Sequence, residues 1–98
     1  MTKGVQLIAE ERQRQIDQEG WTAEHDRQHS RGELAIAAGC YAFPQIVRMA
    51  WGMAQRLWPW GLEWWKPCPE DRIYELQKAG ALIAAEIDRL LAEGGERQ

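Results

Sequence analysis

The residues whose types and spacing best suit ligand binding lie in the stretch WPWGLEWWKP, positions 58 to 67. It holds four of the six tryptophans in the chain, and two prolines and a glycine oppose a regular helix there. Such a segment can seal the core of a small protein, because tryptophan buries a large apolar area. It can also form a platform on which a base stacks. The tryptophans expected to stack on or enclose a base are Trp60, Trp64 and Trp65.

Positive charges near this stretch favour a ligand that carries phosphate. Lys66 and Arg72 flank the tryptophans, and Arg12 is expected to approach from an N-terminal helix. Tyr74 is a further candidate, for contact with a ribose. The start of the last predicted helix is less suited to phosphate, because acidic residues already occupy it.

His25 and His29 stand four residues apart, a spacing that can place two metal ligands on one face of a helix. Together with Asp26 they could hold a divalent ion such as manganese or zinc. A structural or surface role is the alternative. The pair Ser30 and Glu33 forms a capping pattern, which predicts that a helix begins only after these histidines.

The first predicted helix carries a set of carboxylates that could bind magnesium or could form a charged surface: Glu10, Glu11, Asp17 and Glu19. The two arginines that follow the Glu10–Glu11 pair favour the charged surface. No nucleophile with a neighbouring base and no glycine-rich phosphate loop stands out, so no catalytic residue is predicted. No cofactor is predicted either, and only a hydrolase would require magnesium.

Helical periodicity without any strand pattern predicts an all-α fold. We expect one domain, residues 1–98, built as a small bundle of about four helices with a long Trp/Pro-rich loop. The elements are expected at about 4–19, 31–43, 45–57 and 70–93, with the loop at 58–69. Gly20 should end the first helix, and Pro69 should be the first residue of the last. The helix 31–43 should be central, because it is apolar on almost all sides.

The last predicted helix carries residues in alternating steps of three and four, as in a heptad repeat: Ile73, Leu76, Gly80, Ile83, Ile87 and Leu90. This stripe could pack inside the chain's own bundle or against a second copy of the chain. In one small domain we expect the interior. Gly80 should then mark a close helix approach, with Ala37, Ala38 or Gly39 as partners.

Composition narrows the class of protein. The net charge of −3 argues against a binder of duplex DNA, which usually carries a basic surplus. A polar N-terminus argues against a signal peptide, and no apolar run is long enough to span a membrane. Cys40 and Cys68 lack metal-site spacing and fit free thiols in a reducing cytoplasm.

Three blocks of the sequence together resemble a family of small bacteriophage and prophage proteins: EGWTAEHDRQHSRGELAIAAGCYA, WPW…WWKP and R…ELQKAGALIAAEIDRL. The resemblance covers roughly residues 8 to 91. It implies a phage origin and a cytoplasmic place in the infected bacterium, and it implies little chemistry.

A weaker likeness is to the all-α NTP pyrophosphatases of the MazG type. Their metal signature is EExxE on one helix and ExxD on another. This chain has Arg14 in place of the third glutamate, and its Glu86 and Asp88 stand two apart rather than three. If the fold is shared, these departures from the family's metal signature imply that the hydrolytic centre is not shared.

These observations favour a phage-encoded protein, forming a homo-oligomer, that sequesters a nucleotide or cyclic-nucleotide signal of the host as a counter-defence. One alternative is an inhibitor that binds a host defence protein complex. The other is a MazG-like nucleotide pyrophosphohydrolase, which the broken acidic signature disfavours.

Overall fold

The structure, a computed structural model, describes residues 1–94. In that range the chain is all-α and contains no strand, which confirms the all-α prediction. Its elements are α1 (Lys3–Glu19), α2 (Ala23–Asp26), α3 (Glu33–Ala42), α4 (Gln45–Trp51), α5 (Met53–Leu57), the 3-10 turn η1 (Leu62–Trp64) and α6 (Arg72–Ala92).

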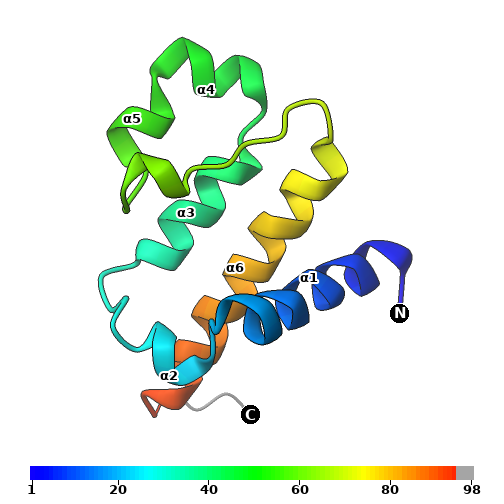
Figure 1. The fold of residues 1–98 in the computed structure, drawn as a ribbon, viewed down its shortest axis with the longest axis vertical. Helices are drawn as coiled ribbons and strands as arrows, with labels where there is room; N and C mark the ends of the chain where they lie inside the picture. Colours follow the sequence, from blue (N-terminus) through cyan, green and yellow to red (C-terminus); the bar gives the residue numbers. More distant parts are fainter. Residues whose placement is uncertain (95–98) are drawn as a thin grey trace.

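Three long helices, α1, α3 and α6, carry the packing (Figure 1). α6 lies against α3, and α1 crosses α6. The short helix α2 also packs on α6. α4 and α5 form a separate arm beyond the end of α3. Only one side of α3 is buried, because Ala35, Ile36 and Ala42 are exposed, so the prediction that it is buried on almost all sides was wrong. α6 is the helix that contacts α3, α1 and α2.

The core lies between α3 and α6. Its buried members are Leu34, Ala37, Ala38, Tyr41, Ala79, Leu82 and Ala85. Alanines at the contact allow the two helices to approach closely, so the core is thin. Its edges are covered by partly buried tryptophans, Trp21, Trp58, Trp60 and Trp65.

The start of α3 differs from the prediction. Gly32, in the left-handed conformation with φ 82°, is the N-cap residue, and it makes no side-chain cap. The Glu33 carboxylate accepts a hydrogen bond from the backbone N–H of Arg31 at 2.6 Å. Ser30 is therefore not the cap, because the glycine turns the chain immediately before Glu33.

Two further helix boundaries differ from the prediction. The expected helix 45–57 is divided at Gly52, whose left-handed conformation (φ 58°) ends α4 before α5 begins. α6 begins at Arg72 because the Asp71 carboxylate accepts a hydrogen bond from the backbone N–H of Tyr74 at 3.1 Å. Pro69 thus lies before the helix. Gly20, at φ 70°, ends α1 as predicted.

The heptad stripe of α6 faces outward, so the prediction that it packs inside the chain was wrong. Its large side chains, Ile73, Leu76, Ile83, Ile87 and Leu90, are each 45–65 % exposed. The opposite side of α6 enters the core through alanines, Leu82 and the fully buried Glu75. Because that side consists largely of alanines and a carboxylate, its sequence pattern is only weakly hydrophobic, although it is the side that packs against α3.

Gly80 does mark a close helix approach, but to a different helix. A Cβ atom at Gly80 would lie 2.6 Å from Cδ1 of Ile8, so α1 crosses α6 at this glycine. The expected partners on α3, Ala37, Ala38 and Gly39, are not the atoms nearest to it.

Candidate functional site

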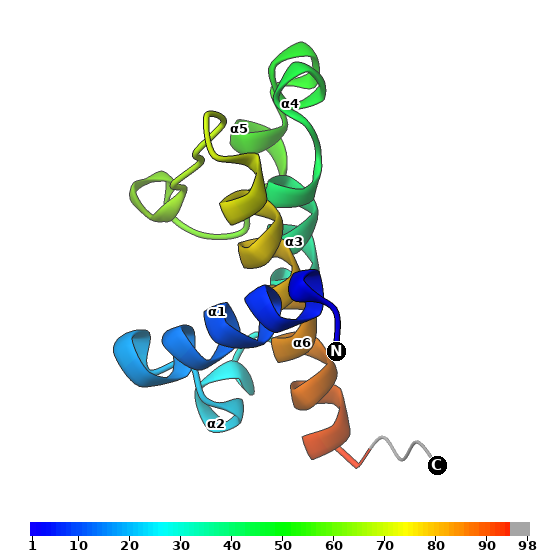
Figure 2. The same ribbon diagram turned by 90° about the vertical axis from the view of Figure 1, so that its right-hand side faces the viewer.

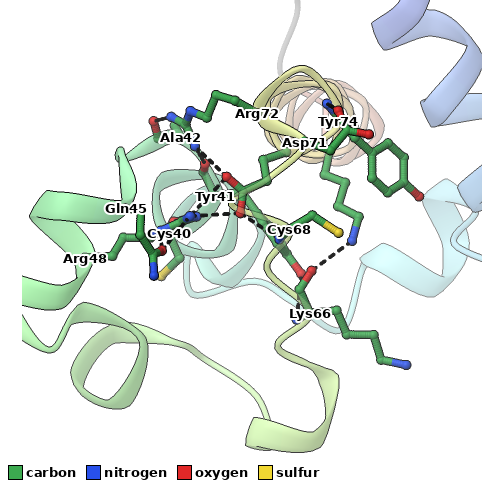
Figure 3. A network of polar contacts seen from close by, with 12 residues as sticks. Cys40, Tyr41, Ala42, Gln45, Arg48, Lys66, Cys68, Asp71, Arg72 and Tyr74 are labelled. Atoms are coloured by element: carbon green, nitrogen blue, oxygen red, sulfur yellow. Dashed lines mark hydrogen bonds and ion pairs between the residues drawn. The ribbon is translucent and has the colours of Figure 1, made fainter.

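The tryptophan-rich segment, residues 58–69, is fixed at its C-terminal end by the buried carboxylate of Glu75. Figure 3 labels its three donor residues, Arg48, Cys68 and Arg72. Arg48 donates to both carboxylate oxygens, at 3.0 and 2.8 Å. The backbone N–H of Cys68 donates to Glu75 Oε2 at 2.8 Å, and Arg72 donates to Oε1 at 3.0 Å. One side chain of α6 therefore joins α4 to the segment.

These contacts keep Glu75 ionised. Burial raises the pKa of its carboxyl, but hydrogen bonds from Arg72, the Cys68 N–H and Arg48 outweigh burial and hold the pKa below its ordinary value. A buried carboxylate with four charge-assisted or backbone hydrogen bonds is costly to remove. Glu75 is therefore a firm anchor that attaches the C-terminal end of the segment to α6.

A second anchor is at Lys66, two residues before Cys68. Its backbone N–H donates to the Tyr41 hydroxyl at 3.2 Å, and its carbonyl accepts from Lys78 Nζ at 3.1 Å. The Lys78 ammonium also lies over the rings of Tyr41 and Tyr74, at 5.1 and 4.9 Å from their centroids. Only the main chain of Lys66 is used in these contacts, so its side chain stays available.

Beside the anchored segment is a cavity of about 460 Å³, here called the aromatic cavity. Its volume lies within the range of small-molecule sites. The walls come from α1, α2 and the turns around it, α3, the tryptophan-rich segment and α6: Glu11, Arg14, Gln15, Glu19, Trp21, His25, Asp26, His29, Leu34, Tyr41, Trp58, Trp60, Gly61, Trp64, Lys66, Lys78 and Leu82.

Aromatic rings in contact run from the core to the α2 side of the cavity. Tyr41 and Trp58 meet edge to face at 5.6 Å, and Trp58 meets Trp60 in the same way at 5.3 Å. Trp60 then contacts His29 at 5.1 Å, and His29 contacts His25 at 5.4 Å. These contacts hold the rings of the inner wall in place.

Trp64 differs from the other tryptophans of the segment. It lines the aromatic cavity, is 62 % exposed, and is not among those that pack on the core. Lys66 is also an exposed lining residue. Within residues 1–94, its ammonium has no hydrogen-bond or ion-pair partner. The two residues form the rim of the cavity, with a ring surface and a positive charge two positions apart.

The remaining charges of the cavity are largely paired. Arg14 donates to the two carboxylate oxygens of Glu11, at 2.8 Å each, and lies 3.6 Å from Glu19. The hydrogen bond to Glu11 is the main reason that the pKa of Arg14 is raised above its ordinary value. Of the basic lining side chains, Arg14 is paired with Glu11 and Lys78 donates to the Lys66 carbonyl. The ammonium of Lys66 is therefore the positive charge most available to a ligand.

Polar atoms without hydrogen-bond partners are concentrated in the walls. Three of the four such buried side-chain atoms known in the described chain belong to lining residues: Gln15 Oε1, Asp26 Oδ2 and Trp60 Nε1. Gln15 and Asp26 are almost completely buried. An unmade hydrogen bond of this kind costs about 1–3 kcal/mol, so a ligand that satisfies these atoms gains affinity. Neighbouring side chains cover these atoms, so only a ligand that displaces those side chains would reach them.

The structure brings three of the seven residues proposed for ligand binding to the aromatic cavity. Trp60, Trp64 and Lys66 line it. Trp65 is turned to the core instead, where its ring lies 4.7 Å from that of Tyr41 and 4.9 Å from that of Trp58.

The other three proposed residues have structural contacts and do not line the cavity. Arg72 donates to the carbonyls of Tyr41 and Ala42 as well as to Glu75. Arg12 donates to the carbonyl of Trp21 at 2.8 Å and to Asp88 at 3.3 Å. Tyr74 lies beneath the Lys78 ammonium.

The candidate metal residues are close together but do not form a ligand set. His25 Nδ1 lies 3.1 Å from Asp26 Oδ1, and His29 Nδ1 lies 3.9 Å from a Glu33 oxygen. The second oxygen of Asp26 faces Arg12 at 3.6 Å. In the part of the chain that the structure describes, no group of three or more His, Cys, Asp or Glu side chains could hold a metal ion.

The carboxylates considered for a hydrolase are dispersed among separate ion pairs. Glu11 pairs with Arg14, Asp88 with Arg12, and Glu86 with Arg89. Asp17 accepts a hydrogen bond from Gln13 at 2.9 Å, and Glu10 is exposed and does not line the cavity. Apart from Glu10, these carboxylates are therefore partners of basic or amide groups and do not gather into one acidic site.

Sequence reasoning missed several lining residues. Gln15 and Lys78 are among them, and Arg14 is predicted only as part of a charged surface. For Gln15 a signal exists, because a spacing of four residues places Glu11, Gln15 and Glu19 along one side of α1. That spacing marks a face, but it does not reveal that the face meets Trp60.

Comparisons of this chain with protein-family models, with curated proteins and with solved structures found no match. No helix within residues 1–94 combines the length and apolar content needed to cross a bilayer.

Proposed function

We propose that this protein binds a nucleotide in the aromatic cavity and holds it without chemical change. The observation that carries the proposal is the rim, where an exposed tryptophan ring and an unpaired lysine lie two positions apart on an anchored segment. A nucleotide offers the matching pair of groups, a flat base and a charged phosphate. Stacking of a base on such a ring contributes roughly 1–3 kcal/mol.

The interior of the cavity supports a base that carries an amino group. Gln15 Oε1 is a hydrogen-bond acceptor and Trp60 Nε1 is a donor, each without a partner. Asp26 Oδ2 is a further acceptor without a hydrogen bond, although it lies 3.6 Å from the Arg12 guanidinium. Adenine, guanine and cytosine each present an amino group beside a ring nitrogen or carbonyl, and so can satisfy both kinds of atom. Uracil and thymine have no such amino group.

The wall chemistry supports binding rather than covalent catalysis. Among residues 1–94, those that line the cavity include no serine, threonine or cysteine, and Glu11 is already bound by Arg14. In the phage setting implied by the three sequence blocks, a binder of this kind would remove a host nucleotide signal from solution. The nucleotide could be cyclic or linear, since either carries a base and phosphate.

The first test is a titration of intrinsic tryptophan fluorescence, with calorimetry in parallel, against mononucleotides, cyclic di- and trinucleotides and ADP-ribose derivatives. We expect saturable binding of one class, and recovery of that ligand intact by chromatography after release. Trp64→Ala should weaken binding at least tenfold while leaving the helical circular dichroism unchanged. Trp51→Ala is the matched control, because Trp51 is 68 % exposed and lies on α4, away from the aromatic cavity.

The outcomes separate the possible roles of the tryptophans. Equal binding by wild type and Trp64→Ala would remove Trp64 from the site. If no member of the panel binds to the folded protein, the nucleotide proposal is wrong. If the recovered ligand is cleaved, the protein is an enzyme, and the hydrolase alternative replaces sequestration.

A second candidate function, binding of a host defence protein, is favoured by the arm formed by α4 and α5. Ile46, Met49 and Trp51 are each more than two-thirds exposed there. An apolar hollow of about 370 Å³ lies beside them, lined by Phe43, Val47, Trp51, Met53, Arg56 and Leu57. Exposed apolar patches of this kind mark protein-interaction surfaces. Pull-down from host lysate with wild type and Ile46→Glu tests it: a partner retained equally by both would exclude this arm.

A further inference from the structure

The two histidines of the chain, His25 and His29, both line the aromatic cavity. His25 lies on α2, and His29 lies between α2 and α3. Figure 2 shows that α2 projects to the same side of the α3–α6 pair as α1 and the tryptophan-rich segment, which supply further walls of the cavity. The histidines therefore border the same space as the rim residues Trp64 and Lys66.

The two imidazole rings are held in place by their neighbours. Their centroids are 5.4 Å apart in an edge-to-face contact, and the His29 ring also meets Trp60 at 5.1 Å. An oxygen of the fully buried Asp26 lies 3.1 Å from Nδ1 of His25. An oxygen of Glu33 lies 3.9 Å from Nδ1 of His29. Each ring is thus oriented both by a carboxylate and by another ring.

The carboxylates determine which ring nitrogen carries the proton. Aspartate and glutamate are ordinarily ionised at neutral pH, and an ionised carboxylate only accepts hydrogen bonds. The ring nitrogen that faces it is therefore the N–H, and in a neutral imidazole the other nitrogen is then an acceptor. His25 and His29 both face a carboxylate with Nδ1, so both present a lone pair at Nε2.

These Nε2 atoms are open to a ligand. Within residues 1–94 neither has a hydrogen-bond partner, and neither is among the polar atoms that are buried without one. The side chain of His25 is 36 % exposed and that of His29 is 19 % exposed. Two neighbouring rings of the wall thus offer unpaired acceptors, and a ligand that fits them must donate hydrogen bonds there.

Within a nucleotide, the ribose supplies two neighbouring donors. Its 2′- and 3′-hydroxyls are adjacent on the sugar, and each can donate one hydrogen bond. An ionised phosphate has only acceptors, and the charge that suits it is the ammonium of Lys66 on the rim. The amino group of a base has its own match in the unpaired acceptor Gln15 Oε1. The pair of Nε2 acceptors therefore suits the sugar.

We propose that His25 and His29 are specificity-determining residues, which accept hydrogen bonds from the 2′- and 3′-hydroxyls of a ribose through Nε2 and so select ribonucleotides over deoxynucleotides. This role rests on the proposed function, because the ribose belongs to the nucleotide in the same cavity. The 2′-hydroxyl is the group by which a protein distinguishes an RNA-type from a DNA-type nucleotide.

The experiment is calorimetry at about pH 8, where imidazole is ordinarily neutral. The probes are the 5′-monophosphates of adenosine, guanosine and cytidine, each with its 2′-deoxy and 3′-deoxy forms. Loss of either hydroxyl leaves an acceptor unpaired and should weaken binding about tenfold. His29→Phe and His25→Phe keep an aromatic ring but remove the acceptor, so each should lose the preference for one hydroxyl. The double variant should bind the ribose and deoxyribose forms equally.

Lys66→Ala is the matched control, because Lys66 contacts the phosphate in the proposed site. It should weaken binding of the ribose and deoxyribose forms by the same factor and so retain the ribose preference. Circular dichroism of each variant should show the helix content of the wild type.

The protonation pattern is tested without any nucleotide. Nitrogen NMR of the free protein at about pH 8 should show a protonated Nδ1 and an unprotonated Nε2 in both rings. The opposite tautomer at both histidines would overturn the proposal, even if a nucleotide binds. Equal affinity of wild type for ribose and deoxyribose forms would overturn it and leave the proposed function intact, as would a ribose preference that persists in the double variant. Failure of every nucleotide to bind would remove both.

Discussion

The guanidinium of Arg48 donates to both oxygens of the Glu75 carboxylate, at 3.0 and 2.8 Å, and both side chains are almost fully buried. This ion pair joins α4 to α6 across 27 positions of sequence. Because Glu75 also accepts from the Cys68 N–H, the same pair sets where the tryptophan-rich segment ends. The position of the candidate site thus depends on a buried polar contact between α4 and α6.

The stability of the protein should fall in acid because of Glu75. Its pKa in the folded chain lies below the ordinary value of 4.5, so its contribution is complete above that pH and is lost as the pH falls through the folded pKa. Glu75→Gln should lower the free energy of unfolding by about 2 kcal/mol at neutral pH. Urea denaturation from about pH 7 to about pH 3 measures both proteins.

The gap between the two proteins should narrow as the pH falls below 4.5 and through the lower folded-state pKa of Glu75, because the wild-type carboxylate is protonated there. Glu33 also has a lowered pKa, although burial opposes the effect of its backbone hydrogen bonds. Its contribution is common to both proteins and cancels in the difference. A gap that stays constant with pH would show that Glu75 is not the group responsible.

Arg12 should prove to be a structural residue rather than a ligand contact. It links α1 to Trp21, Asp26 and Asp88. Arg12→Met leaves the fully buried Asp26 without its cation and should cost about 3 kcal/mol or more. Asp26→Asn should recover part of this loss in the double variant, which thermal unfolding of the four proteins would measure. Full stability of Arg12→Met would contradict the assignment.

Gly80→Ala should destabilise the wild-type chain. The new methyl would lie 2.6–2.7 Å from Cδ1 and Cγ1 of Ile8, and overpacking of this kind typically costs about 1–3 kcal/mol. In an Ile8→Ala background the space is free, and the same change should stabilise α6 by about 1 kcal/mol through helix propensity. A double-mutant cycle by urea denaturation gives both values. The same sign in both backgrounds would mean that Ile8 does not set the limit.

Lys66→Ala should weaken binding of phosphorylated ligands and spare the corresponding nucleosides. A hydrogen bond to a charged group contributes about 1.5–3 kcal/mol, which corresponds to a loss of tenfold or more in affinity. Calorimetry with a nucleoside and its phosphates measures the difference. Lys3→Ala is the control, because Lys3 is exposed at the start of α1, outside the cavity. Equal losses for nucleoside and nucleotide would place the phosphate elsewhere.

The helix content could be predicted from the sequence, whereas the side of α6 that packs in the core could not. The apolar run of α3 and the end of α1 at Gly20 are local signals, and both are confirmed. The stripe on α6 is an equally strong local signal, but it marks an outward face, because alanines and Glu75 form the inner one. Spacing shows that a face is apolar, and it does not show which neighbour covers it.

The same limit applies to the candidate site. Trp60, Trp64 and Lys66 could be identified from residue type alone, since they lie together in the sequence. Arg12 and Arg72 have the right chemistry for phosphate, but buried carbonyls and carboxylates use their donors. Gln15 and Asp26 enter the cavity through the crossing of α1 over α6 and the position of α2, which are tertiary contacts without a local sequence signal.

The two contacts made by Lys66 use only its backbone, and this has a consequence for how such a protein evolves. Any residue except proline supplies the same N–H and carbonyl to Tyr41 and Lys78. Mutation at this one codon can therefore change the charge at the rim while the fold is inherited unchanged. Ligand choice and folding are separable here, so position 66 is where we expect selection, natural or in a directed library, to alter specificity first.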